Sequence, residues 1–278
     1  MRHKVIDYAS EEGGLAKNVA LLHALRLRPS SSSSSAAAAS NCDGPTIIVA
    51  NVHVLFNPGR GDIKIAQVRV LAAAAAQMRA DFDDAPVIMA GDFNCVPDSP
   101  LYRFLAEGSS AFINYDRKEM SGQVEGMHVG AGAGRRAASP KPSPRPPKKP
   151  PRKAKFDPGP NHWRPEHIAT ALGHPPEESD NTSISSGGET GGGPVVHLGL
   201  EVASAYAAVL GREPDYTSAH RRFVGTVDYV WYGGGGLVPT RVLLPADLEF
   251  GFGHAGLPDW NYPSDHQALT IDFAWRRA

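Results

Sequence analysis

Two short apolar runs on either side of a long helical pattern constrain the fold of this chain more than any other feature. Residues Thr46–Val52 are β-branched and apolar on both faces, which predicts a buried strand. From Asp62, the predicted N-cap, apolar residues recur at helical spacing as far as Phe82. Residues Pro86–Ala90 predict a second buried strand. This order predicts an α/β protein with a sheet packed under helices.

The other predicted elements fall into two blocks. In the first block, Pro97 and Asp98 begin another helix, which Gly108 ends. The second block begins near Val195 and alternates in the same way. Its elements are a helix-like stretch in Leu198–Leu210 and strands at Thr226–Tyr232, Leu237–Leu244 and Ala268–Trp275.

The charge of the chain separates an acidic body from one basic segment. The 278 residues include 28 Lys+Arg and 29 Asp+Glu, for a formal net charge of −1. Residues 131–155 hold nine of the basic residues and no acidic residue, which leaves 19 basic against 29 acidic residues, a net of −10, elsewhere. Because prolines throughout this segment exclude helix and sheet, we expect a disordered linker; nucleic-acid binding and nuclear import are the alternatives.

The low-complexity runs set the domain prediction. We expect one domain over residues 1–278, with disordered insertions at about 29–43 and 123–194. Two cysteines cannot form a disulfide framework, and no run approaches the ~18 apolar residues of a spanning helix. We therefore expect no membrane contact and a reducing compartment, which is the cytoplasm by default, with nuclear entry through the basic segment as the alternative.

Polar side chains lie where two of the apolar strands end. Asn51 and His53 end the first strand, and Asp92 and Asn94 follow the second. At positions i and i+2, the side chains of Asp92 and Asn94 can face the same way off an extended segment. One anionic and one amide group aimed together suit a phosphate and its attacking water. The alternative is an Asx-turn after a strand, which is common.

Two further polar groups come late in the chain. Asp228 lies within an apolar strand, where a carboxylate is costly unless it is paired. It is therefore either the partner of a buried cation or the cap of a turn. Ser264, Asp265 and His266 form a cluster just before the last strand.

Together and in this order, these motifs resemble the endonuclease/exonuclease/phosphatase superfamily. They are most similar to its carbon catabolite repressor 4-like branch, which includes deadenylases, nocturnin and the Angel proteins. The segments that carry the resemblance are ANVHVLFNPGRGDIKIAQVRVL at 50–71, PVIMAGDFNCVPDSPLYRFL at 86–105, EPDYTSAHRRFVGTVDYVWY at 213–232 and LPDWNYPSDHQALTIDF at 257–273. KNVALLHAL at 17–25 is similar to an upstream segment of that branch, and YDRKEMSGQ at 115–123 is similar to plant-type members.

The resemblance implies a role for each matching residue. Asp92 would activate the attacking water, and Asn94 would contact the scissile phosphate. His266 would contact the same phosphate and stabilise the charge that builds there, while Asp228 would pair with His266 and orient it. His53 would be a second phosphate ligand.

The resemblance also implies a metal site. Asp265 and Asp92 would belong to a site for Mg²⁺, with Mn²⁺ as the alternative, because hard cations prefer carboxylate oxygens. The principal metal ligand of the family is a Glu upstream of the segment at 17–25. The resemblance therefore implies that this ligand is absent here and that the fold is N-terminally truncated.

The resemblance implies a fold and an activity. The fold is a four-layer α/β sandwich that holds the C-terminal portion of the domain, with an apolar sheet surface exposed where earlier strands would pack. The activity is Mg²⁺-dependent phosphodiester hydrolysis, most closely that of a 3′-exoribonuclease which shortens mRNA poly(A) tails and works with proteins of a deadenylase complex. The alternatives are a related phosphodiesterase or phosphatase with another nucleotide or phosphoester substrate, and an inactive truncated paralogue.

Overall fold

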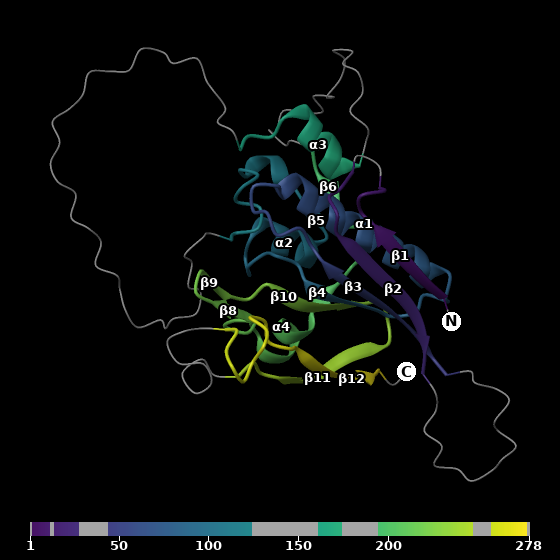
Figure 1. The fold of residues 1–278 in the computed structure, drawn as a ribbon. Coiled ribbons are helices and arrows are strands. Elements are labelled where there is room, and N and C mark those ends of the chain that lie inside the picture. The colour runs from purple at the N-terminus through teal and green to yellow at the C-terminus, as the bar shows by residue number, and fades with distance from the viewer. Residues whose placement is uncertain are drawn as a thin grey trace, which may run out of the picture.

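A mixed sheet of six strands is the centre of the part of the chain that the computed structural model describes, which is residues 2–11, 14–27, 44–123, 161–173, 194–246 and 257–276 (Figure 1). The strand order is β1-β2-β3-β4-β10-β7, and of these neighbours β3 and β4 are parallel while the other pairs are antiparallel. The strands are β1 Arg2–Asp7, β2 Val19–Arg26, β3 Thr46–His53, β4 Val87–Asp92, β10 Asp228–Gly233 and β7 Ala203–Ser204.

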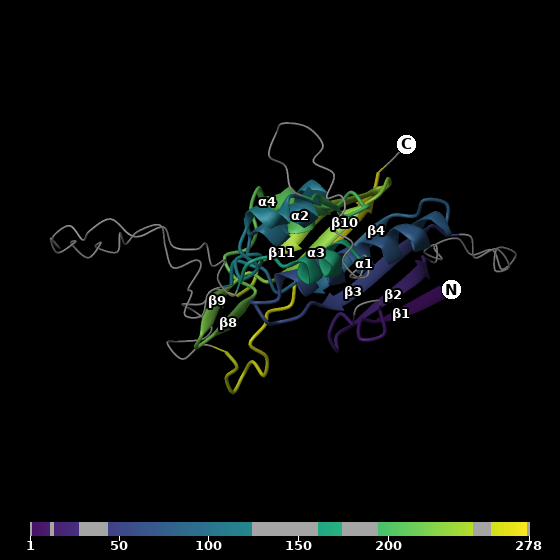
Figure 2. The same ribbon diagram turned by 90° about the horizontal axis from the view of Figure 1, so that it is seen from above.

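Helix α1, Gly61–Ala80, connects the two parallel strands β3 and β4. Parallel neighbours need such a crossover, and the run of alanines from residue 72 favours helix. The apolar stripe of α1, which includes Ile65, Val68 and Leu71, is fully buried in the core. Figure 2 shows α1 lying over β3 and β4.

The start of α1 differs from the prediction, because Asp62 is not its N-cap. The helix begins at Gly61. Its N-cap is Arg60, whose side chain accepts no capping hydrogen bond from the first turn. Asp62 lies in the first turn and is fully buried. Its carboxylate pairs with the guanidinium groups of Arg60 at 2.8 Å and Arg117 at 3.5 Å. These ion pairs occupy the oxygens that a capping bond would use.

Helix α2, Pro100–Glu107, ends where its sequence predicts but begins at Pro100, after the cap Ser99, and not at Pro97 and Asp98. The Ser99 hydroxyl accepts a hydrogen bond from the Tyr102 N–H at 3.2 Å, and proline follows the cap at the first helical position. Gly108 ends the helix in the left-handed conformation, with a φ of 74°.

Helix α3, Pro165–Leu172, corrects the prediction of one disordered insertion over 123–194. Residues 161–173 are ordered because they pack on the core. The ring of Trp163 lies 4.5 Å from that of Phe112, and its indole N–H donates to the carbonyl of Tyr115 at 2.7 Å. The insertion at 29–43 and the basic segment 131–155 lie outside the described residues.

Small elements complete the described part of the chain. Figure 1 shows the pair β11–β12 on the side of the main sheet opposite α1. No helix among these residues is long and apolar enough to cross a bilayer. The pairs are β11 Leu237–Leu243 with β12 Thr270–Trp275, β8 Ser218–His220 with β9 Phe223–Gly225, and β5 Ser109–Ser110 with β6 Val196–His197; the helices are α4 Ala205–Leu210 and a 3₁₀ turn at Phe112–Asn114.

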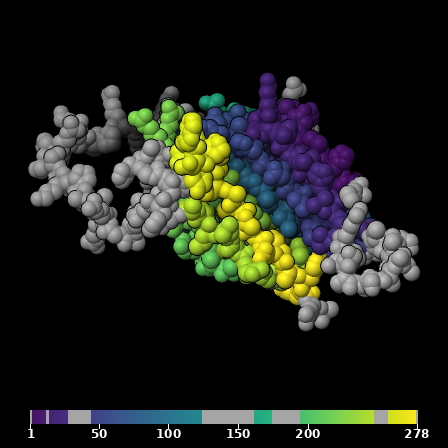
Figure 3. All heavy atoms as spheres, turned by 60° about the horizontal axis from the view of Figure 1, so that its bottom comes forward, coloured from purple at the N-terminus to yellow at the C-terminus, as the bar shows by residue number. Residues whose placement is uncertain are grey.

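The second face of the sheet is partly uncovered at β1 and β2, as predicted for an apolar sheet surface. Along β2, Ala20 and Leu22 are buried, whereas Val19 and Leu21 on the other face are 58% and 40% exposed. Figure 3 shows this purple part of the molecule beside the yellow β12, with neither covering the other. The mixed sheet, with α1 on one side and β11–β12 on the other, agrees with the predicted α/β sandwich.

Candidate active site

Three polar side chains form a row across the ends of neighbouring strands. In the parallel pair β3–β4, His53 lies opposite Asp92, and in the antiparallel pair β4–β10, Asp92 lies opposite Asp228. Residues opposite one another in a sheet share a face and are close in space. His53 Nε2 is 3.4 Å from Asp92 Oδ2, although the His53 side chain is two-thirds exposed.

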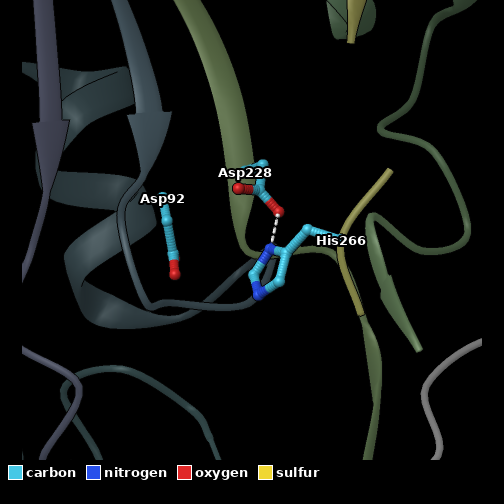
Figure 4. Close-up of side chains that lie close together, drawn as sticks. All are labelled: Asp92, Asp228 and His266. Carbon is cyan, nitrogen blue, oxygen red and sulfur yellow. Dashed lines mark hydrogen bonds and ion pairs between the residues drawn. The ribbon is translucent and has the colours of Figure 1, made fainter. Parts of the chain in front are cut away.

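His266 joins this row from the loop before β12. Its Nδ1 lies 2.7 Å from Asp228 Oδ2, and Figure 4 shows the ring between Asp228 and the space beside Asp92. The Thr217 hydroxyl donates to the same carboxylate oxygen at 2.7 Å. A β-bridge between Ser218 and His266 holds the backbone of the loop against β8. Of the two interpretations of Asp228, the structure therefore contains the pairing with a cationic group.

Burial and charge set opposite protonation states in this cluster. Burial raises the pKa of Asp92 to about 6, and the neighbouring charge of Asp228 contributes in the same direction. The hydrogen bond to Asp228 raises the pKa of His266 to about 9, although burial opposes this change. Near pH 7, Asp92 is therefore largely a carboxylate of raised basicity, and His266 is an imidazolium.

Asn94 positions Asp92 through a turn. Its backbone N–H donates to Asp92 Oδ1 at 2.7 Å, which is the Asx-turn alternative, and its φ of 48° is left-handed rather than extended. The side chains therefore do not project in parallel from an extended strand. The Asn94 amide is buried and donates to Val54 O at 2.8 Å and Asp92 Oδ2 at 3.2 Å. Its contact with a substrate phosphate stays a prediction.

Gly91 allows β4 to approach β3 next to the row. Its φ is 137°, and a Cβ placed there would lie 2.0 Å from the carbonyl oxygen of Val52. Only glycine accepts both this backbone conformation and this contact. Asn51 adds a side-chain bond between the same two strands, because its Nδ2 donates to Ala90 O at 3.2 Å.

A buried lysine that the sequence analysis missed supports the Asn94 turn. Lys64 is fully buried on α1, and its Nζ donates to Asn94 O at 2.7 Å and to Gln123 Oε1 at 3.0 Å. Gln123 in turn donates from Nε2 to Asn94 Oδ1 at 3.1 Å. Burial lowers the pKa of Lys64 to about 8. The available signal was its spacing, because Lys64 is four residues before Val68 and seven before Leu71 on the buried stripe of α1.

The cluster offers oxygen ligands for a hard divalent cation. Ligand atoms of Asp92, Asp228 and His266 lie within 4.8 Å of one another. Burial, and then the neighbouring Asp228, raise the pKa of Asp92, and a bound cation would oppose both effects. The two carboxylates therefore fit an ion such as Mg²⁺, whereas a protonated imidazole cannot be a ligand. Asp265 is not part of this cluster, and its role as a metal ligand stays a prediction.

Comparisons with known proteins agree with this geometry. The sequence profile of the Endonuclease/Exonuclease/phosphatase family matches residues 35–266. Carbon catabolite repressor protein 4 homolog 3 of Arabidopsis thaliana is 33% identical over 275 residues, which cover 94% of this chain and 51% of that protein. Protein angel homolog 2 of Bos taurus is 29% identical over 82% of this chain and 44% of its own length. The chain thus spans about half the length of these relatives.

Solved structures show the same fold. The crystal structure of ANGEL2, a 2′,3′-cyclic phosphatase, in complex with adenosine-2′,3′-vanadate matches with a TM-score of 0.61 and 26% identity, over 99% of this chain and 67% of that one. The human nocturnin catalytic domain matches with a TM-score of 0.51 at 17% identity, over 99% of this chain and 59% of that one, which concerns the fold alone. The family match and the relatives show that the chain belongs to the endonuclease/exonuclease/phosphatase family, in its carbon catabolite repressor 4-like branch, and the row of acidic and histidine side chains at the strand ends agrees with this.

Proposed function

We propose that this chain hydrolyses phosphodiester bonds at the 3′ end of RNA in the presence of Mg²⁺, with poly(A) tails as the substrate. The observation that carries the proposal is the pairing of a carboxylate of raised basicity, Asp92, with an imidazolium, His266, in one cluster. Such a pair suits the attack of water on an anionic phosphate. The likeness to proteins named carbon catabolite repressor protein 4 homologs supports RNA tails as the substrate.

The residues divide the reaction between them. Asp92 accepts a proton from the attacking water, which its raised pKa favours near neutral pH. His266 donates from Nε2 to a phosphate oxygen, while Asp228 holds the ring by Nδ1 and keeps it charged. Mg²⁺ held by the carboxylates, when bound, would neutralise phosphate charge and stabilise the leaving oxyanion. RNA is then the direct partner, and deadenylase-complex proteins and a cytoplasmic or nuclear location belong to the same proposal.

The test is the shortening of a 5′-labelled RNA with an adenosine tail, followed on a sequencing gel with Mg²⁺ or EDTA. Asp92→Asn and His266→Gln should each slow shortening about 100-fold or more, because each removes one half of the acid–base pair. Asp272→Asn is the matched control, since Asp272 lies on β12 and pairs with the exposed Arg241 instead. Equal rates for the wild type and both site variants would refute the proposal.

A second candidate is removal of a 2′,3′-cyclic phosphate, and the likeness to the ANGEL2 structure with adenosine-2′,3′-vanadate favours it. The same residues serve this reaction, because it is also attack of water on a phosphodiester. RNA ending in a 2′,3′-cyclic phosphate and the same RNA ending in a hydroxyl separate the two candidates. Loss of the terminal phosphate without shortening would favour the phosphatase.

A further inference from the structure

The loop that carries His266 is tied to the β8–β9 hairpin at both of its ends. The Leu257 N–H donates to Ala219 O at 2.7 Å, and the Ala219 N–H donates to Asp265 O at 2.9 Å. Leu257 also packs with Tyr216 and Ala219 in a small apolar cluster separate from the main core. Residues 216–225 and 257–267 therefore form one unit beside the active site, which we call the rim.

The rim carries an indole side chain that is not packed against the rest of the protein. Trp260 is 99% exposed, whereas a side chain of this size is normally largely buried. The backbone around it is held in a turn, because Asp259 Oδ1 accepts the N–H groups of Asn261 and Tyr262, both at 2.8 Å. Trp260 is three positions after the anchor at Leu257, so its Cα lies within roughly 11 Å of the Leu257 Cα. The backbone that carries the indole thus belongs to the ordered loop that leads into His266.

The turn of the β8–β9 hairpin adds positive charge to the rim. Arg221 and Arg222 are adjacent and exposed, and neither guanidinium makes an ion pair with the described residues. The chain outside the basic segment has a net charge of −10, and these two adjacent arginines contrast with that overall acidic charge. Exposed arginines and an exposed aromatic ring within one ordered unit are the combination that binds single-stranded nucleic acid, by phosphate contacts and base stacking.

We propose that the rim binds single-stranded RNA beside the bond that is cleaved, with a base stacked on Trp260 and phosphates bound by Arg221 and Arg222. The inference rests on the proposed function, because that function makes the His53–Asp92–Asp228 row the place of cleavage. Stacking accepts every base, so the rim supplies affinity rather than a preference for adenine.

The test measures binding without cleavage. The full chain, in EDTA, is titrated with a fluorescein-labelled oligoadenylate and an oligouridylate, and anisotropy gives Kd. Trp260→Ala should weaken binding of both about five- to 100-fold, and Trp260→Phe should retain most of the affinity. Trp275→Ala is the matched control, because Trp275 lies on β12 outside the rim. Arg221→Gln with Arg222→Gln should reduce the slope of log K against log salt by about 1.4.

The outcomes distinguish RNA binding by the rim from RNA hydrolysis at the active site. Affinity unchanged in Trp260→Ala, or lowered equally in Trp275→Ala, would overturn the rim proposal even if the wild type shortens RNA. An effect confined to Trp260 and the two arginines supports it, even if the wild type shortens no RNA and the proposed function fails. No detectable RNA binding by the wild type would overturn it as well. A thermal melt of each variant is the control that its fold is retained.

Discussion

At the scale of single residues, the bond between His266 and Asp228 decides the charge of the site. The hydrogen bond to Asp228 raises the pKa of His266 to about 9. The contribution of this bond to the stability of the folded chain is therefore fully present below the ordinary histidine pKa of about 6.5, and it is lost as the pH rises through about 9. In Asp228→Asn, the pKa of His266 should fall toward about 6.5. NMR titration of ¹³C-labelled histidine in EDTA, with His266→Gln to identify the signal, measures both values. A wild-type pKa near 6.5 would contradict this account.

Lys64 acts on the site through its neighbours. Lys64→Met should lower the rate of RNA hydrolysis about 10–100-fold, since the carbonyl of Asn94 and the amide of Gln123 lose their donor. Lys64→Arg, which keeps the donors, should restore part of the rate. Lys118→Met, on the exposed surface, is the matched control. A loss of stability in Lys64→Met with an unchanged rate per folded molecule would limit Lys64 to a structural role.

The sequence could predict the residues of the cluster but not the residues behind them. Asp92 and Asp228 stand out because charged groups at or within apolar strands need a reason to be there, and His266 stands out through the polar cluster before the last strand. Lys64 lies in a helix where a lysine usually faces water, and its partner Gln123 lies 59 positions away, beyond α2. Local spacing places Lys64 on the buried stripe of α1, but only tertiary packing brings Lys64 to Gln123. Spacing alone could therefore not predict the pair.

At the scale of elements, the close approach of β3 and β4 depends on Gly91. Gly91→Ala should destabilise the chain by more than about 1 kcal/mol, because its φ is 137° and the added Cβ would overlap the carbonyl of Val52. Urea unfolding measures the change. Gly235→Ala is the matched control, since no atom lies within 4 Å of its added Cβ, and it should change stability by less than about 0.5 kcal/mol. Equal changes would refute the steric explanation.

Elements with a clear periodic pattern were predictable, and elements that depend on their neighbours were not. Helices α1 and α2 and strands β3 and β4 follow from apolar spacing and capping residues. Strand β1 begins with Arg2, His3 and Lys4, and its pairing with β2, rather than its own composition, makes it a strand. Helix α3 is short and stands between proline-rich sequences, so its order comes from packing against α1.

At the scale of the whole molecule, the uncovered face of β1 and β2 should control self-association. Val19, Leu21 and Leu25 are 58%, 40% and 42% exposed on one strand near the edge of the sheet, and such a surface promotes contact between copies. The triple variant with threonine at these positions should remain monomeric at concentrations where the wild type associates, as measured by sedimentation velocity. Threonine keeps the β propensity, so the unfolding midpoint should change little.

The buried face of the same strand gives the control for this prediction. Leu22→Ala removes a fully buried side chain and should lower the free energy of unfolding by about 2–5 kcal/mol. Opposite effects on neighbouring positions would show that one face of β2 holds the core and the other governs association. If the threonine variant associates as the wild type does, another surface is responsible. The distinction matters for every binding experiment on this chain, because self-association changes the concentration of monomer that is titrated with RNA.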